Sequence, residues 1–272
     1  MYFICPKCGA PLKEVGAACK CPAGHSFDKS REGYYNLLLG SSGGTHGDNK
    51  EMIEARRLFL SLGHYRPLAE LVAEMAAKSI HAGGVILDAG LGEGYYTEIV
   101  AQKLAAQYGD GEVKVIGFDI SKDAVRRAAK RRGISSLAVA SSYHMPIKEG
   151  SVDLVLNIFS PQAAEQTHRA LKPSGKFLMV IPGEEHLFGL KEKIYETPYK
   201  NAPENTDIAG FELLEKRELR YTVSLGAPEE ISALFMMTPY AYRTSKEGRE
   251  RVLSLDTLST EAHFIALLYE KK

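Results

Sequence analysis

Two short loops near the N-terminus carry side chains that bind metals. Cys5 and Cys8 flank a Pro-Lys turn, and Cys21 and His25 flank a Pro-Ala-Gly turn. Three thiolates and one imidazole can close a tetrahedral zinc site, and a closed site is structural because it leaves no position for a substrate. Zinc would also explain how about 30 residues with few large apolar side chains can fold. We therefore predict one structural Zn²⁺ ion held by Cys5, Cys8, Cys21 and His25.

Cys19 is the alternative third ligand. We favour Cys21 because it opens a Cys-Pro loop that mirrors Cys5 and Pro6, which leaves Cys19 as a bystander. A redox pair is the competing interpretation of Cys5 and Cys8, but such a pair would be expected in a thioredoxin-like βαβ context. The flanking residues lack that pattern, so we expect metal binding.

A glycine-rich segment, Asp88-Ala-Gly-Leu-Gly-Glu-Gly94, follows a short apolar run and precedes a stretch of helical period. Glycines at such a turn let a ligand approach the backbone closely. Dinucleotide enzymes share glycine loops, but an acid two residues before the first glycine resembles the pattern of Rossmann-like methyltransferases. We therefore predict an S-adenosylmethionine site that uses Asp88, Gly90, Gly92 and Gly94.

Three polar residues stand at or near the ends of later apolar runs. Asp119 closes the second run, where an acid hydrogen-bonds the ribose of adenosine. Ser141 follows the third run and would flank the adenine. Asn157 lies near the end of the fourth run, where it would border the transferred methyl group and act as the catalytic hydrogen-bond acceptor. Loop capping and turn formation are the structural alternatives for Ser141 and Asn157.

Alternating apolar runs and helical segments must position these residues. Helical periods begin near Tyr95, Lys122 and Gln162, and this alternation predicts a parallel sheet with helices on both faces. Two C-terminal strands flank a helical segment at Glu229–Met236. The seven expected strands are Val85–Ala89, Val113–Ile120, Leu137–Ala140, Val152–Phe159, Lys176–Ile181, Leu213–Leu225 and Ala262–Tyr269.

The fold class is therefore α/β: a Rossmann-like class I methyltransferase domain with a mostly parallel seven-stranded sheet, preceded by a small zinc ribbon. We place the zinc-binding module at residues 1–36, a linker and helical segment at 37–80, and the methyltransferase domain at 81–272. Residues 40–50 are glycine-rich and nearly devoid of apolar groups, which predicts a flexible connection. Glu51–Leu62 and Pro67–Lys78 have helical period.

The overall charge gives no sign of a nucleic-acid partner, because 34 Lys and Arg balance 34 Asp and Glu. An RNA surface would have to be local. Residues 1–35 carry five cations and three acids, and a helix expected at Asp123–Arg132 carries five cations, although a solvated helix face is the favoured interpretation there. A signal peptide and an apolar run of about 20 residues are both missing, so we expect a cytoplasmic protein without a membrane partner.

The chain resembles the 23S rRNA (guanine-N1)-methyltransferase family, also called rRNA large subunit methyltransferase A. The resemblance covers almost the whole chain. It rests on the zinc-ligand set and on the segments Arg31–Leu38, Ala55–Tyr65 and Gly92–Thr97. It implies methyl transfer to N1 of a guanine in a hairpin of 23S rRNA, presented as free rRNA or in a large-subunit assembly intermediate. Some members of that family confer macrolide resistance. Whether the protein forms a homodimer is left open.

The same resemblance implies cofactor contacts from Tyr65, from Gly92 with Glu93, and from His186. Their sequence context alone would have marked Tyr65 and His186 as ordinary surface residues. The chain departs from its relatives at Leu91, where a cysteine can stand, and in the segment Asn157–Pro161.

Methyl transfer to guanine N1 requires loss of its proton while the base is in line with the methyl group, and no covalent nucleophile is needed. Asn157 as a hydrogen-bond acceptor at the edge of the pocket and Glu93 as a more remote carboxylate are the candidates for the base or acceptor. The guanine must be unpaired or extruded, so Phe159 or Tyr96 could stack on it, with a core role as the alternative. Methylation at C5 of a pyrimidine is disfavoured, because no cysteine follows Cys21.

Other functions compete with this interpretation. A methyltransferase acting on a small metabolite would share the cofactor loop but would not explain the ribbon, and another RNA could replace 23S rRNA. A non-enzymatic RNA-binding protein is disfavoured by the intact cofactor loop with Asp119. An NAD-dependent enzyme is disfavoured by Asp88.

Overall fold

A mostly parallel sheet forms the centre of the computed structural model, which describes residues 1–40, 49–203 and 206–272. Within these residues the sheet has eight strands in the order β10-β11-β9-β8-β5-β6-β7-β4, and β11 pairs antiparallel with both of its neighbours. The strands are β4 (Tyr35–Asn36), β5 (Val85–Ala89), β6 (Lys114–Asp119), β7 (Ser136–Val139), β8 (Val152–Ile158), β9 (Leu171–Pro182), β10 (Phe211–Leu225) and β11 (Leu258–Lys271).

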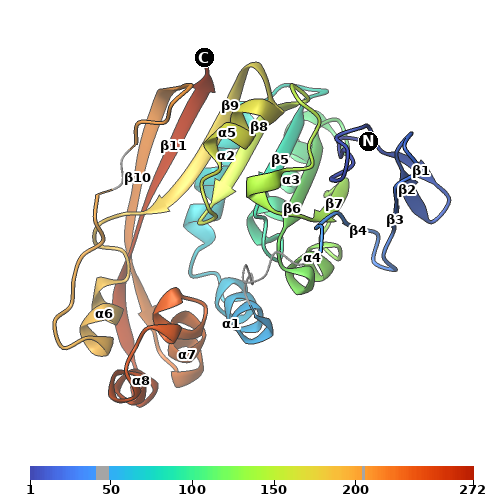
Figure 1. Cartoon of the computed structure of the whole chain (residues 1–272). Coiled ribbons are helices and arrows are strands. Elements are labelled where there is room, and N and C mark those ends of the chain that lie inside the picture. Colours follow the sequence, from blue (N-terminus) through green and yellow to red (C-terminus); the bar gives the residue numbers. More distant parts are fainter. Residues whose placement is uncertain (41–48, 204–205) are drawn as a thin grey trace.

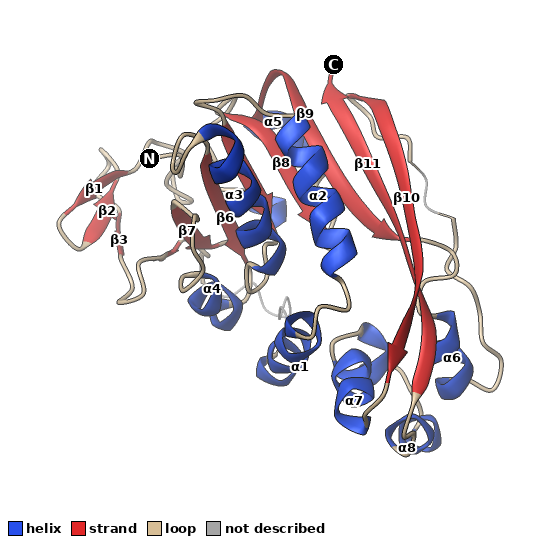
Figure 2. Cartoon of the chain, turned by 180° about the vertical axis from the view of Figure 1, so that it is seen from behind, coloured by secondary structure: helices blue, strands red, loops and turns tan. Residues whose placement is uncertain are grey.

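Helices cover both faces of this sheet (Figures 1 and 2). Helices α2 (Arg66–Lys78) and α3 (Tyr95–Tyr108) lie on one face, and α5 (Ala164–Ala170) lies on the other. Alternate residues of β5 serve the two layers, since Ile86 packs in the cluster of α2 and α3 whereas Val85 and Leu87 pack on the opposite side. Burial on both faces explains why the strands appear as continuous apolar runs.

The seven predicted strands are all present, and the predicted fold class is confirmed with one addition. An eighth strand, β4, pairs parallel to β7 at the edge of the sheet through Tyr35 and Asn36. Its two residues came within the predicted zinc module. A two-residue pairing has no periodicity for a sequence pattern to reveal, so this link between ribbon and sheet escaped prediction.

A group of helices surrounds the far end of the long β10–β11 hairpin (Figure 1). It contains α6 (Phe188–Ile194), α7 (Pro228–Met236), the 3₁₀ helix η2 (Pro239–Tyr242) and α8 (Lys246–Leu253). Helix α1 (Lys50–Ser61) packs against α7. Of the predicted flexible connection at 40–50, residues 41–48 lie outside the described residues.

The N-terminal module is a small antiparallel sheet of β1 (Lys13–Val15), β2 (Ala18–Lys20) and β3 (Ser26–Asp28). It is attached to the segment that follows β7. The Ile4 N–H donates to the Pro146 carbonyl at 2.9 Å, and the Lys148 N–H donates to the Tyr2 carbonyl at 3.0 Å. Phe3 is buried in one apolar cluster with residues of the main sheet. The ribbon therefore packs against the larger domain and shares its apolar core.

The part of the chain that the structure describes contains no helix with the length and apolar character that a membrane span requires.

Candidate functional site

The four predicted zinc ligands converge at the tip of the ribbon. Their ligand atoms all lie within 4.8 Å of one another. The Sγ atoms of Cys8 and Cys21 are 3.7 Å apart, and Nδ1 of His25 lies 3.4 Å from Sγ of both Cys5 and Cys21. A tetrahedral site with Zn–S bonds of about 2.3 Å separates neighbouring sulfurs by about 3.8 Å. The arrangement therefore fits a closed structural zinc site.

Cys19 does not belong to this group. Its side chain is fully buried in the apolar cluster that joins the ribbon to the sheet, and burial raises its thiol pKa to about 11. At Cys21, by contrast, the effect of burial is outweighed by the sum of hydrogen bonds with the His25 backbone, the Cys8 side chain, the Ala23 backbone and the Cys5 side chain, and the pKa falls to about 7. Thiolate is the metal-binding form of cysteine, so the chemistry agrees with the geometry.

The glycine loop connects β5 to α3 at the carboxyl end of the sheet. Gly90, Gly92 and Gly94 have φ values of +93°, +57° and +80°, in the left-handed region that favours glycine. The N–H groups of Gly90 and Leu91 donate to the carbonyl of Phe118 at 2.9 and 3.1 Å, which ties the loop to β6. These hydrogen bonds tie the loop to the neighbouring strand.

Asp88 lies at the base of this loop and is 2% exposed. Its Oδ2 accepts a hydrogen bond of 2.6 Å from the Thr97 hydroxyl, and its Oδ1 has no partner among the described residues. Burial raises the pKa of Asp88 to about 7, and the negative charge of Asp119 adds to that effect.

Asp119 and Ser141 lie at the ends of the next two strands. The carboxylate of Asp119 accepts from the Gly92 N–H at 3.0 Å and from the Ser121 N–H at 2.8 Å. The Ala140 N–H donates to the Asp119 carbonyl at 3.0 Å, so the two predicted cofactor positions are adjacent. The Ser141 hydroxyl accepts from the Tyr143 N–H at 3.2 Å, which is the loop-capping role that the sequence left open.

The end of β8 borders the glycine loop. Asn157 is buried; its Nδ2 donates to the Pro161 carbonyl at 3.1 Å, and its Oδ1 has no partner within the described ranges. Ser160 lies against the first glycine of the loop, because a Cβ atom on Gly90 would come within 2.1 Å of the Ser160 Oγ. Phe159, which lies between them in the sequence, has a φ of +54° and is 44% exposed.

Tyr65 and His186, 121 positions apart, meet beside Phe159. The Tyr65 hydroxyl lies 3.4 Å from His186 Nε2, and the rings of His186 and Phe159 are stacked with their centroids 6.4 Å apart. Both residues are buried, at 3% and 8% exposure, so the expectation of ordinary surface positions was wrong. Burial lowers the pKa of His186 to about 3 and raises that of Tyr65 well above its usual value.

Glu93 is buried and ion-paired. Nη2 of Arg131 lies 3.0 Å from its Oε1, and Nη1 of the same guanidinium lies 2.8 Å from Glu98. Burial nevertheless raises the pKa of Glu93. No sequence motif pointed to Arg131 as a partner of the loop, because the pair joins positions 38 residues apart and appears only when the chain folds.

The predicted cationic helix at Asp123–Arg132 is corrected by the structure. Helix α4 (Lys122–Ala128) ends four residues earlier, before Gly133, and the cations do not share one helix face. Arg126 is paired with Asp123 at 3.2 Å, Arg127 with Glu54 at 2.7 Å and Arg131 with Glu93 at 3.0 Å, so three of the five charges have acidic partners within the chain. This favours a structural role for these arginines.

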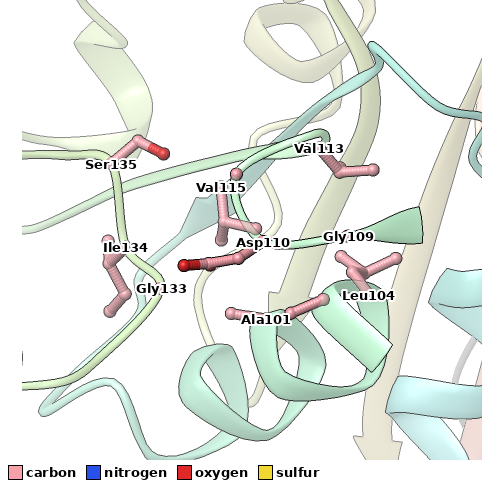
Figure 3. A pocket seen from close by; sticks show the side chains of 11 residues that line it. Ala101, Leu104, Gly109, Asp110, Val113, Val115, Gly133, Ile134 and Ser135 are labelled. Atoms are coloured by element: carbon pink, nitrogen blue, oxygen red, sulfur yellow. The ribbon is translucent and has the colours of Figure 1, made fainter. Parts of the chain in front are cut away.

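A cavity of about 280 Å³ lies at the other end of the strands (Figure 3). It is lined by the end of α3 and by the segments that enter β6 and β7, including Asp110, Gly133 and Ser135. Ligands of open α/β sheets bind beyond the carboxyl ends of the strands, so this cavity is on the wrong side for the cofactor. It contains none of the predicted site residues.

Comparisons with known proteins agree with both halves of the molecule. Residues 3–39 match the family model described as "RlmA, N-terminal", and residues 80–226 match the model described as "Methyltransferase domain". A Streptomyces fradiae protein named 23S rRNA (guanine(748)-N(1))-methyltransferase is 35% identical over 71% of this chain and 68% of its own length. A Bacillus subtilis protein, provisionally named 23S rRNA (guanine-N(1)-)-methyltransferase, is 31% identical over 90% of this chain and 88% of its own.

A solved Bacillus halodurans structure, provisionally described as a methyltransferase, superposes with a TM-score of 0.51 and 17% identity. The match covers 75% of this chain and 98% of that one. At this identity the likeness concerns the fold alone.

Proposed function

The chain belongs to the 23S rRNA (guanine-N1)-methyltransferase family, and from this premise we propose that it methylates N1 of a guanine in a hairpin of 23S rRNA. It is an S-adenosylmethionine-dependent methyltransferase with one structural zinc ion, as the sequence predicted. The observation that carries the proposal is the combination, in one chain, of the family's ribbon with the methyltransferase domain. Methylation of a small metabolite would not explain the presence of that ribbon.

The proposed cofactor site surrounds the carboxyl ends of β5, β6 and β7. Gly90, Gly92 and Gly94 would present the loop backbone to the cofactor, and Asp119 would accept from the ribose hydroxyls. A carboxylate has about four acceptor positions, so the hydrogen bonds from the Gly92 and Ser121 N–H groups do not by themselves exclude a ribose. S-adenosylmethionine supplies the activated methyl group when bound.

Further proposed contacts come from both sides of that loop. Asp88, with one oxygen lacking a partner among the described atoms, supports the loop from below. Ser141 would flank the adenine. Glu93, Tyr65 and His186 complete the proposed cofactor contacts.

For the guanine we propose a place between Asn157 and Phe159. The Oδ1 of Asn157 is a buried acceptor with no partner in the described structure, and such a group costs free energy unless a ligand pairs with it. The N1–H and the 2-amino group of guanine are donors that could satisfy it. Asn157 suits this task better than Glu93, because the Glu93 carboxylate is committed to Arg131.

Phe159 would provide the stacking surface for an extruded base. An exposed phenylalanine in a left-handed conformation is strained, and strain of this kind is retained where the surrounding structure uses it. Its neighbours Tyr96 and His186 limit where the ring can move. Aromatic stacking is the usual way in which proteins hold unpaired RNA bases.

The proposal is tested by transfer of tritiated methyl groups from S-adenosylmethionine to 23S rRNA from a strain that lacks this methylation. We expect labelling by the wild-type protein and its loss in Gly92→Arg, which blocks the cofactor loop. Phe159→Leu should raise the KM for rRNA without weakening cofactor binding. If the wild-type protein binds cofactor but labels no RNA, the substrate is a small molecule; if it labels another RNA, the assignment to 23S rRNA is wrong.

A further inference from the structure

His263, in β11, touches the turn at Gly183–Leu187 at several points. Its backbone carbonyl accepts from the Gly183 N–H at 2.8 Å, and its side-chain Nδ1 accepts from the Glu185 N–H at 3.1 Å. Its ring packs against Gly183 so closely that a Cβ atom there would lie 2.4 Å from it. This buried side chain therefore holds the turn that carries His186.

The same strand also fixes which nitrogen of His186 carries the proton. The backbone N–H of His263 donates to His186 Nδ1 at 3.3 Å, so Nδ1 is the acceptor of the ring. Because burial lowers the pKa of His186 to about 3, the ring is neutral near pH 7 and its one proton is on Nε2. That nitrogen lies 3.4 Å from the Tyr65 hydroxyl.

The consequence reaches Tyr65. If Nε2–H donates to the Tyr65 oxygen, the hydrogen of the Tyr65 hydroxyl is directed to another acceptor. The ring of Phe264, the residue after His263, lies 4.9 Å from the Tyr65 ring and 4.7 Å from the His186 ring. These contacts restrict the rotamers of both side chains, so the position of the hydroxyl oxygen is preset.

We propose that His263 is a positioning residue: by holding the 183–187 turn it fixes His186 as a donor to Tyr65, which makes the Tyr65 hydroxyl a donor to the cofactor's carboxylate. The amino-acid end of the cofactor carries a carboxylate, which accepts hydrogen bonds, and an ammonium, which only donates them. A tyrosine committed to donating selects the carboxylate. This inference rests on the proposed function only in taking Tyr65 as a cofactor contact.

Two His263 variants separate positioning from simple packing. Asparagine can present its Oδ1 to the Glu185 N–H much as Nδ1 does, whereas leucine leaves that N–H without its partner. Calorimetry would compare S-adenosylhomocysteine with 5′-methylthioadenosine, which has the adenosine and thioether but no carboxylate. We expect His263→Leu to weaken binding of S-adenosylhomocysteine about tenfold and that of methylthioadenosine less than about twofold. His263→Asn should bind both ligands nearly as the wild type does.

The ¹⁵N shifts of His186 in the wild-type protein give an independent readout that does not depend on the variants folding. We expect Nε2 protonated and Nδ1 unprotonated. A proton on Nδ1, an equal loss of both ligands in His263→Leu, or unchanged affinity in a folded His263→Leu would each overturn the proposal. None of these measurements uses RNA, so their failure is distinct from a failure to methylate rRNA.

Discussion

Asp88 is an unusual carboxylic acid, buried at the end of the first strand of the domain with one hydroxyl partner. Its pKa is about 7 in the folded protein and ordinary when the chain unfolds, so the native state holds a proton that the unfolded state releases. Stability from this group is therefore present at low pH and is lost as the pH rises from about 4 to 7.

We expect Asp88→Asn to raise the melting temperature of the cofactor-free protein at pH 8 and to change it little at pH 5. The amide retains an acceptor for Thr97 and removes the buried charge. Thermal unfolding at both pH values measures the difference, with Asp110→Asn on the surface as the matched loss of one carboxylate. A larger gain at pH 5 than at pH 8 would show that Asp88 is not the titrating group.

Among the described residues, Arg131 alone forms an ion pair with the Glu93 side chain. Truncating Arg131 would leave the buried Glu93 carboxylate without that partner. We expect Arg131→Met to lower the free energy of unfolding by about 2 kcal/mol, less than for a fully buried pair because Arg131 is partly exposed. Adding Glu93→Gln should recover part of that loss. Urea denaturation of the wild type, the two single variants and the double variant measures the coupling free energy between the two side chains. If the two single effects add up to that of the double variant, the pair does not interact.

Several residues of the zinc site and the proposed cofactor site could be predicted from local sequence motifs. The zinc ligands, the glycines, Asp88 and Asp119 belong to local motifs whose chemistry fixes the residue types. Arg131 and His263 could not be predicted, because an arginine or a histidine becomes significant only through partners far away in the sequence.

At the scale of elements, the contact between the glycine loop and the end of β8 is the tightest part of the candidate site. We expect Gly90→Ala to destabilise the protein more than Gly92→Ala. Both glycines have positive φ, but only at Gly90 would a Cβ collide with Ser160, whereas nothing lies within 4 Å of a Cβ at Gly92. Equal losses in the free energy of unfolding would indicate that backbone strain alone sets the cost.

Adding Ser160→Gly removes the atoms on the other side of that collision. It should restore part of the stability of Gly90→Ala and none of that of Gly92→Ala. Urea denaturation of the two double variants measures this, and equal recovery in both would contradict a direct contact between the loops.

The elements themselves were predictable to different degrees. Strands buried on both faces give apolar runs, and helices of several turns give a clear period, so β5 was predicted with its observed bounds and α3 with its observed start. The two-residue strand β4 is too short for a period to emerge. Helix α4 was overestimated because cations and alanines continue past Ala128 in turns that favour similar residues.

At the scale of the whole molecule, the ribbon packs against the segment that leads away from the proposed cofactor site. Phe3 and Cys5 are buried in the same cluster as Met145 and Ile147, in the connection that begins at Ser141. We expect zinc removal to weaken binding of S-adenosylhomocysteine by at least about fivefold, because loosening the ribbon frees this connection. Calorimetry on Cys8→Ser, with Lys7→Ala as the non-ligand control, measures the effect. Equal affinity in the two variants would mean that the ribbon and the cofactor site are independent.

The assembly at this scale was the least predictable from the sequence. The motifs indicated two modules and a connection, but they gave no sign that the ribbon is joined to the sheet through β4 and the Phe3–Ile147 bridge. The meeting of Tyr65 and His186 is likewise a product of the fold. The division at residues 36 and 80 stays a prediction, as do the homodimer, the cytoplasmic location and any effect on macrolide sensitivity.

Methylation of guanine N1 can be detected by primer extension on 23S rRNA treated with the protein and S-adenosylmethionine. A methyl group at N1 blocks base pairing and stops reverse transcriptase. We expect one new stop next to a hairpin guanine, present with the wild-type protein and missing with Gly92→Arg. Incorporation of methyl groups into the rRNA without any such stop would contradict methylation at N1.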